Sequence, residues 1–475
     1  MSTAKVHRWL AIGVGLMVPV WFASGTILSF EPFPALDGAT RLAALRPIEA
    51  GAIHVSPGGA VAGAGVEDVV RLRLVAPDGR ARYVIEGGAG EVVTVDAVTG
   101  ARNEATSAQQ ARAVAERLVA APAIGVDGPL DFDRWTVHDR YRPFAPWWRV
   151  RFADPAGTAL YVSARSGEVL QRTRARERAW NQVGALLHWL NLGTLRAAPE
   201  TWRLTVRAVA TFALALTLVG LVLGVQRIAQ ARRAAARAAA PGRQRWSPFR
   251  GLRKAHHLCG LAGGFIILWW LTSGWLSLDA GTLFSTDRPT AAQRAALRGA
   301  PLAAALGGLR GMDAAVLAGA RELEFVVAGG EPGLIARGGD GGPIVRVPPQ
   351  SLAALRARIE QAWRPAHVLR VEPLAADDAY ALRGSPFPPG ALRFVLDDAA
   401  ATWVHVDAAS GQIVSVMDRS RRTRRWLVEG LHTLDFPPLA RAGSTWHVLL
   451  VIATSCGFAF ALTGIVLAVR SLRRR

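Results

Sequence analysis

Histidine is the residue type whose placement in this sequence predicts chemistry. The chain has ten histidines. Six of them lie beside long apolar segments: His7, His188, His256, His257, His432 and His447. Neutral imidazole is the commonest metal ligand among side chains, and a polar group at membrane depth generally has a function or a partner. The remaining four lie in polar segments, where surface exposure or packing on strands accounts for them: His54, His138, His367 and His405.

Four uncharged segments near the first six histidines are long enough to cross a bilayer. They are Leu10–Phe30, Ala208–Val225, Leu258–Leu278 and Val448–Val469. A helix of about 20 apolar residues spans the hydrocarbon core, so we expect four transmembrane helices. The first segment, with Lys5 and Arg8 before it, also resembles a cleaved signal peptide. Its apolar run is longer than the core of such a peptide, and the third span echoes its sequence, which favours a retained helix.

The distribution of basic residues predicts how these helices are oriented. The segment Arg227–Lys254 carries nine Lys or Arg and no acid, the tail Arg470–Arg475 carries four Arg, and Lys5 and Arg8 precede the first span. Short basic segments stay in the cytoplasm. We therefore expect both termini and the central loop to be cytoplasmic, and the two long segments to be periplasmic, in the inner membrane of a Gram-negative cell. Most of the net charge of +20 is then an orientation signal rather than a nucleic-acid footprint.

The two halves of the chain match as an internal duplication. The matches are Lys5-Val-His7 with Lys254-Ala-His256, Ser24-Gly25 with Ser273-Gly274, Tyr161–Gly167 with His405–Gly411, Leu187-His188 with Leu431-His432, and Thr201-Trp202 with Thr445-Trp446. Two spans per repeat return the chain to its starting side, so the repeats are parallel and their pseudo-twofold axis runs along the membrane normal. We therefore expect His7 to face His256 near one membrane face, and His188 to face His432 near the other.

The predicted fold is a four-helix transmembrane bundle with two α+β periplasmic domains. The expected boundaries are a first helix at 1–30, a first domain at 31–178, an interfacial segment and second helix at 179–227, a basic loop at 228–253, a third helix at 254–278, a second domain at 279–424, an interfacial segment and fourth helix at 425–469, and a tail at 470–475. The absence of cysteine from both domains excludes a disulfide scaffold.

Alternating residues and turn signals predict the elements inside the domains. Hairpins are expected at Trp148–Ala153 with Thr158–Ser163, and at Leu392–Leu396 with Thr402–Val406. A helix is expected over Ser107–Ala120. Ser351 is a candidate N-cap for a helix that carries Leu352, Leu355 and Ile359 inward.

Two opposed imidazoles in a helical bundle are what an axially ligated haem iron requires. The two levels predict two haems, held by His7 with His256 and by His188 with His432. His447 corresponds to Arg203 in the first repeat, and either bonds a propionate or replaces His432 as a ligand. His257 follows His256 directly and competes with it. Arg203 is a candidate partner for a haem propionate, since arginine binds carboxylates bidentately.

Several of these motifs resemble the PepSY-associated transmembrane protein family. The motifs are Lys5–Leu10, Ser24-Gly25, Ser273-Gly274, Gly430–Phe436 and Thr463-Gly464, and the segments Leu160–Leu170 and Val404–Val414 are similar to the last strands of PepSY domains. The resemblance covers nearly the whole chain. It implies a dihaem inner-membrane reductase, with a b-type haem near each membrane face, that reduces a ferric siderophore or another ferric chelate in the periplasm and so releases Fe(II).

Other functions fit the sequence less well. No dinucleotide fingerprint is present, so electrons would come from membrane quinol or from a cytosolic reductase. A non-redox PepSY module that binds peptides or proteases would leave the paired histidines without a role. A permease for an iron chelate would need polar groups at the bilayer midplane, and the four spans contain no Asp, Glu, Lys or Arg.

Overall fold

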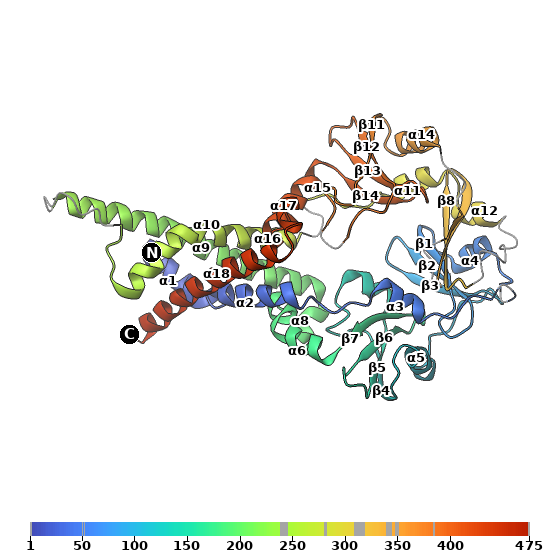
Figure 1. The fold of residues 1–475 in the computed structure, drawn as a ribbon, viewed down its shortest axis with the longest axis horizontal. Coiled ribbons are helices and arrows are strands. Elements are labelled where there is room, and N and C mark those ends of the chain that lie inside the picture. Colours follow the sequence, from blue (N-terminus) through green and yellow to red (C-terminus); the bar gives the residue numbers. More distant parts are fainter. Residues whose placement is uncertain are drawn as a thin grey trace.

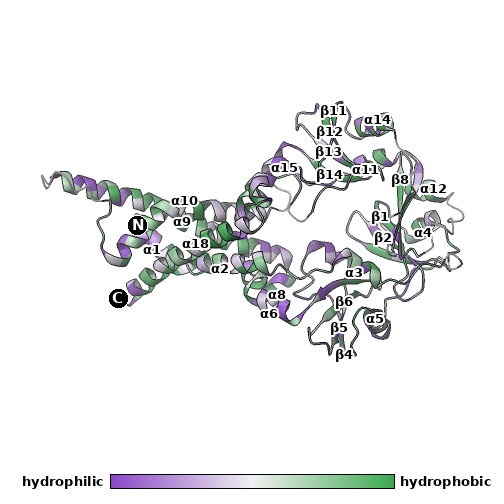
Figure 2. Ribbon diagram, in the orientation of Figure 1, coloured by the Kyte–Doolittle hydropathy of each residue, from purple (hydrophilic) through white to green (hydrophobic). Residues whose placement is uncertain are grey.

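The computed structural model is elongated, with long helices and both chain termini at one end and three β-sheets at the other (Figure 1). It describes residues 2–49, 51, 53–237, 246–279, 283–307, 319–338, 344–346, 351–382 and 385–473. Residues 238–245 of the predicted basic loop lie outside that set. Hydrophobic residues dominate the middle of the helical end, and hydrophilic residues reappear at both termini (Figure 2).

Within the part of the chain that the structure describes, three single helices are long and apolar enough to cross a membrane: α9 (Pro199–Arg237), α10 (Gly251–Ser277) and α18 (Ser444–Leu472). The first predicted span is instead divided into α1 (Thr3–Val14) and α2 (Met17–Phe30), which meet at a bend of 47°. Pro19 accounts for the bend, because it has no N–H to donate to the carbonyl of Gly15. The protein is therefore a mixed α+β chain with three membrane-capable helices and one bent pair.

Helix α9 is longer than the sequence analysis expected. The expected basic loop began at 228, but α9 continues to Arg237 and projects beyond the other helices (Figure 1). The added segment is rich in Ala, Arg and Gln, which are strong helix formers. The membrane-capable helices pack as neighbours, with α9 against α10, α2 against α18, and α1 against α9. Their shared core consists of Val18, Phe22, Ala213, Ile267, Leu271 and Ala461.

Each half of the chain contributes one complete antiparallel sheet. The first contains β4 (Ala123–Leu130), β5 (Trp147–Phe152), β6 (Ala159–Ser163) and β7 (Val169–Thr173), in chain order. The second contains β11 (Val368–Pro373), β12 (Ala391–Leu396), β13 (Trp403–Asp407) and β14 (Ile413–Met417), also in chain order. Both predicted hairpins are present, as β5–β6 and β12–β13.

One helix in each half accompanies these sheets. Ser107 caps α5 (Ala108–Ala115) and Ser351 caps α14 (Leu352–Ala362), each by accepting a hydrogen bond from a backbone N–H of the first turn. Leu355 and Ile359 are buried as expected. The prediction for Leu352 is wrong: it is the first helical residue and is exposed, because only the later turns reach the core.

The third sheet is shared between the two halves, which the sequence analysis did not foresee. Its order is β10-β9-β8-β1-β2-β3. The first half provides β1 (Val69–Val75), β2 (Arg82–Gly87) and β3 (Val92–Asp96), and the second provides β8 (Glu322–Ala328), β9 (Glu331–Arg337) and β10 (Ile344–Arg346). Strands β1 and β8 pair antiparallel at the junction, with Leu74 opposite Leu323 and Arg73 opposite Glu324.

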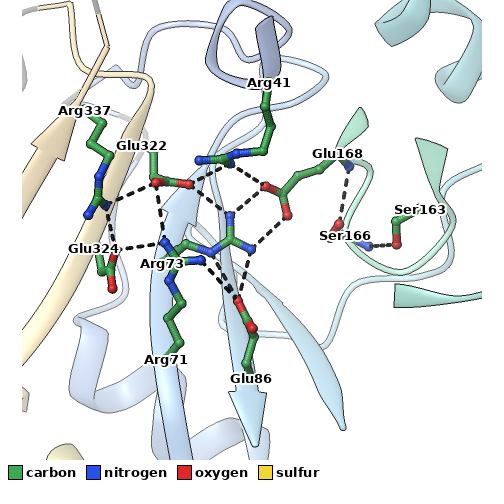
Figure 3. A network of polar contacts seen from close by, with 10 residues as sticks. All are labelled: Arg41, Arg71, Arg73, Glu86, Ser163, Ser166, Glu168, Glu322, Glu324 and Arg337. Atoms are coloured by element: carbon green, nitrogen blue, oxygen red, sulfur yellow. Dashed lines mark hydrogen bonds and ion pairs between the residues drawn. The ribbon is translucent and has the colours of Figure 1, made fainter. Parts of the chain in front are cut away.

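A network of buried ion pairs crosses this junction (Figure 3). Arg73 is buried and binds both carboxylate oxygens of Glu168, at 2.6 and 3.1 Å, and one oxygen of Glu322 at 3.0 Å. Burial alone would raise the pKa of Glu322, but Arg73 and Arg41 outweigh burial and lower the pKa to about 2. The stability that ionised Glu322 contributes is therefore lost only as the pH falls below the ordinary carboxylate range toward 2.

Glu168 precedes β7, so the network also ties the shared sheet to the first four-stranded sheet. In the second half, Gln412 stands where Glu168 stands in the first, and its side-chain amide donates to Glu324 at 3.3 Å. Both four-stranded sheets are thus fastened to the shared sheet from equivalent turns.

Candidate functional site

Two cavities lie one after the other along the helices. The domain-side cavity, of about 680 Å³, is lined by His188, His432 and several tryptophans. The terminus-side cavity, of about 780 Å³, is lined by His7, His256 and His257. Val18 lines both cavities, so a thin layer of apolar side chains separates them. Both volumes fall in the range of pockets that hold cofactors.

In the domain-side cavity, His188 and His432 approach each other closely. His188 ends α7 (Ala185–His188) and His432 lies in α16 (Leu431–Thr433), which follows a π-helical turn at Arg425–Gly430. The ring centroids are 6.0 Å apart and the ring planes meet at 59°. Two imidazoles on one metal ion would have centroids about 6 Å apart, since each metal–nitrogen bond takes about 2 Å and each ring adds about 1 Å. The spacing therefore fits a single iron between the two rings.

Equivalent tryptophans hold the backbone of these two histidines. The indole N–H of Trp21 donates to the carbonyl of His188 at 3.0 Å, and that of Trp270 donates to the carbonyl of His432 at 2.9 Å. Trp21 and Trp270 occupy matching positions in the two repeats. The position of each histidine is thus fixed by a membrane-capable helix of its own repeat.

Equivalent serines also hold the two rings. Ser24 Oγ lies 3.0 Å from His188 Nδ1, and Ser273 Oγ lies 3.1 Å from His432 Nδ1. Each serine hydroxyl donates its one hydrogen to a backbone carbonyl, Ser24 to Val20 and Ser273 to Trp270. Its oxygen therefore accepts from Nδ1–H of the imidazole. This tautomer leaves a lone pair on Nε2, which is the form that binds a metal.

The terminus-side histidines have the same tautomer through different partners. His7, on α1, donates from Nδ1 to the backbone carbonyl of Leu216 at 3.2 Å. His256, on α10, lies with Nδ1 2.8 Å from the hydroxyl of Thr463, which itself donates to the carbonyl of Phe460. Among the described residues, none donates to or accepts from Nε2 of either ring. His256 also stacks on Phe460, with 4.8 Å between ring centroids.

Each of the four imidazoles lies against a glycine on a neighbouring helix. A Cβ added to Gly220 would lie 2.8 Å from Cε1 of His7, and one on Gly464 would lie 3.1 Å from Cε1 of His256. The corresponding distance is 3.2 Å for Gly25 with His188 and for Gly274 with His432. A larger residue at any of these sites would push the ring away. These four glycines therefore leave room for the imidazole rings where they lie.

The alternative ligand His257 uses both of its ring nitrogens for hydrogen bonds. Nδ1 lies 2.9 Å from Ser247 Oγ, and Nε2 donates to the carbonyl of Gly224 at 2.9 Å. This buried histidine lines the terminus-side cavity but fastens the segment before α10 to α9. It has no lone pair left for a metal in this arrangement.

The structure brings neither His447 nor Arg203 into the domain-side cavity. His447 stacks on Phe30, with 5.3 Å between ring centroids, and is not among the lining residues. Arg203 pairs instead with Glu200 at 2.8 Å. Neither residue is placed to assist His432 or to bind a propionate in that cavity.

His405, which sequence analysis assigned to strand packing, lies buried on β13. Its Nε2 accepts from Arg393 at 3.0 Å and its Nδ1 bonds with Ser415 at 2.8 Å. Burial and the charge of Arg393 lower the pKa of His405 to about 3. Like His257, this histidine has both nitrogens engaged with the protein.

The charges around the two cavities differ strongly. Five arginines line the terminus-side cavity: Arg8, Arg227, Arg250, Arg253 and Arg470. No charged side chain is among the described residues that line the domain-side cavity. The sequence alone predicts only that these arginines orient the helices in a membrane. Their position beside His7 and His256 makes them candidate partners for haem propionates at that level.

The hydroxyls of Ser24, Ser273 and Thr463, which hold imidazole rings through Nδ1 and are called tethers below, were not predicted from the sequence. The sequence nevertheless carries a signal for them. Ser24-Gly25, Ser273-Gly274 and Thr463-Gly464 each join a hydroxyl that holds an imidazole to a glycine that seats one. The repeated hydroxyl–glycine pair is therefore a local signature of the site.

Within the described residues, no group of three or more His, Cys, Asp or Glu could hold a bare metal ion. Each cavity does offer two histidines whose Nε2 has no hydrogen-bond partner among the described residues, which is the number that a six-coordinate haem iron takes from a protein. A scan against protein-family models finds no match, and a search of the curated proteins finds none either. The similarity to the PepSY-associated family therefore stays a prediction from the sequence.

Proposed function

We propose that this chain is a dihaem membrane protein that carries electrons across a bilayer to a ferric chelate on the side of the β-sheets. The observation that supports this most directly is the state of four histidines. His7, His256, His188 and His432 each commit Nδ1–H to the protein. Each pair lines one cavity with Nε2 left available, whereas His257 and His405 use both nitrogens.

Haem b in each cavity would supply the one-electron Fe(III)/Fe(II) couple. The residues of the chain would ligate the iron, fix the ring planes and keep water from the metal. The tethers from Ser24, Ser273 and Thr463 orient the rings and raise their basicity, which strengthens ligation. Tryptophans around the domain-side cavity would cover the macrocycle edge.

In this proposal α1 with α2, α9, α10 and α18 form a four-helix transmembrane bundle. The arginine-lined end, with both termini, is cytoplasmic, and the sheets are PepSY-like periplasmic domains in the bacterial inner membrane. The distribution of basic residues supports this orientation. The substrate class, a ferric siderophore or other ferric chelate, follows from the family resemblance.

The experiment is to purify the full chain from haem-replete cells and to record its absorption spectrum before and after dithionite. We expect b-type bands and about two haems per chain, one for each histidine pair. A ferric chelate added to the reduced protein should reoxidise the haems and release Fe(II) to a chromogenic trap. A colourless protein would contradict the proposal and favour a non-redox binding module. Chelate uptake into vesicles without haem reoxidation would favour a permease.

A further inference from the structure

The end of the molecule that carries both termini forms an acid-free basic surface. Residues 1–30, 201–278 and 444–475 contain no Asp or Glu. Five arginines line the cavity there, and α9 extends outward with three more that are exposed: Arg232, Arg233 and Arg237. None of these eight arginines forms an ion pair with another described residue. Their charge is therefore available to a partner.

This charge exceeds what a haem in the terminus-side cavity would need. A haem carries two propionates, so two of the five lining arginines suffice to pair with them. The three on the α9 extension lie outside the cavity lining altogether. Most of the positive charge therefore has no assigned counter-ion within the protein.

The α9 extension reaches too far to serve only lipid headgroups. From the end of the apolar span at Val225 to Arg237 the helix rises about 18 Å, at 1.5 Å per residue. The headgroup region adds about 5–8 Å to each side of the hydrocarbon core. The tip of the helix thus stands in water, as its projection beyond the other helices indicates (Figure 1).

An exposed tryptophan lies on the same surface. Trp246 is 55% exposed, and the guanidinium of Arg232 lies over its ring at 5.1 Å. Three residues later, Phe249 lines the terminus-side cavity and contacts His257 edge-on. Tryptophan and arginine are the residues that most often anchor protein interfaces. An apolar anchor surrounded by positive charge fits the surface of an acidic protein.

We propose that this surface docks a soluble, acidic, one-electron carrier protein, which delivers electrons to the terminus-side haem. The inference rests on the proposed function, because it assumes a haem in that cavity. A haem iron takes up one electron at a time, which excludes direct hydride donors. A neutral quinol would gain nothing from the charge. In the step itself, one electron leaves the reduced carrier and one Fe(III) becomes Fe(II), with no bond made or broken.

The test uses the full chain in nanodiscs of neutral phosphatidylcholine, with an acidic [2Fe–2S] ferredoxin as the probe. The variant is Arg232→Gln/Arg233→Gln/Arg237→Gln. A matched control, Arg80→Gln/Arg142→Gln/Arg419→Gln, removes three exposed arginines at the opposite end. Binding of oxidised ferredoxin is measured first, because it requires neither haem nor turnover. The rate of haem reduction by reduced ferredoxin is then followed by stopped flow at increasing salt.

We expect the wild type and the control to bind the ferredoxin and to be reduced at a rate that falls with ionic strength. The variant should keep its haem, bind more weakly, and be reduced about tenfold more slowly at low salt, with the rates converging at high salt. Equal, salt-independent rates and equal binding in all three proteins would overturn the docking proposal. So would a loss confined to binding of anionic phosphatidylglycerol vesicles, which would assign the surface to lipid. A protein without haem that still binds ferredoxin through these arginines would contradict the proposed function and leave the docking surface intact.

Discussion

The two histidine cavities share the arrangement of their imidazoles but differ in their surroundings. On the domain side, both rings are held by serines, both backbones by tryptophans, and no charge is among the described lining residues. On the terminus side, one ring is held by a backbone carbonyl and the other by a threonine, within a set of five arginines. The two halves thus share a histidine Nε2 without a hydrogen-bond partner among the described residues and a glycine against each ring, whereas the charges around the two cavities differ.

Under the proposed dihaem function, the largest expected effect is the loss of one haem from one of the two cavities. His432→Ala removes a ligand of the domain-side cavity only, so we expect about half of the bound haem to be lost and the rest to keep its spectrum. Haem per chain and low-temperature absorption bands measure this. His447→Ala is the matched control, because His447 lies outside the cavity lining, and it should keep both haems. Loss of haem from His447→Ala instead would reverse the ligand assignment.

Replacing a glycine that lies against a terminus-side histidine should reduce haem content nearly as much. Gly220→Leu would force its Cβ to within 2.8 Å of the His7 ring, so the ring must turn away and the terminus-side haem should be lost. Gly263→Leu is the control, since a Cβ there meets nothing within 4 Å. Haem content and thermal unfolding, measured together, separate loss of the site from loss of the fold. Full haem content in Gly220→Leu would show that haem binding does not need a glycine against the His7 ring.

Removing the serine hydroxyl that holds one imidazole should weaken haem binding in that cavity and leave the other cavity unchanged. Ser24→Ala leaves His188 in place but frees its ring, and loss of such a partner typically costs about 10–100-fold in metal affinity. We expect the domain-side haem to dissociate faster into apomyoglobin, with the terminus-side haem unchanged. Ser29→Ala is a suitable control, because Ser29 lines the same cavity and, among the described residues, its hydroxyl bonds only to the carbonyl of Thr26. Equal rates of haem dissociation from the two serine variants would contradict the assigned hydrogen bond from His188 Nδ1–H to Ser24.

The smallest expected effect is on the potential of the terminus-side haem. A positive charge stabilises Fe(II) relative to Fe(III), so Arg253→Gln should lower the reduction potential of that haem by an amount on the order of tens of millivolts. The domain-side haem should not shift. Potentiometric titration of wild type, Arg253→Gln and the control Arg203→Gln measures both. A shift of both haems, or of the domain-side haem alone, would contradict the assigned charge asymmetry.

Much of this arrangement follows from local sequence patterns. The apolar runs give the membrane-capable helices, alternation gives the β5–β6 and β12–β13 hairpins, and the repeats indicate which histidines are equivalent. The division of the first span was missed although Pro19 is visible in the sequence. The α9 extension was missed because its arginines suggested a loop, whereas its alanines favour helix.

The shared sheet could not be predicted in the same way. Strands β1 and β8 lie far apart in the chain, and their pairing depends on contacts that no local pattern encodes. In its local sequence, Arg73 predicts a strand residue with an exposed side chain. It is buried only because Glu168 and Glu322 come from other parts of the fold. The tethers were hidden for a related reason, since a Ser–His contact joins residues more than a hundred positions apart.

The charges on β1 and β8, the two strands at the junction, also affect which strands can pair there. Arg71-Leu72-Arg73 on β1 and Glu322-Leu323-Glu324 on β8 occupy equivalent places, and Arg73 lies opposite Glu324. If two copies of the protein met through β1 alone in this register, arginine would oppose arginine, and β8 with β8 would oppose glutamate to glutamate. Like charges directly opposite each other destabilise a strand pair. The sign difference thus favours pairing of β1 with β8 over pairing of two like halves from neighbouring molecules.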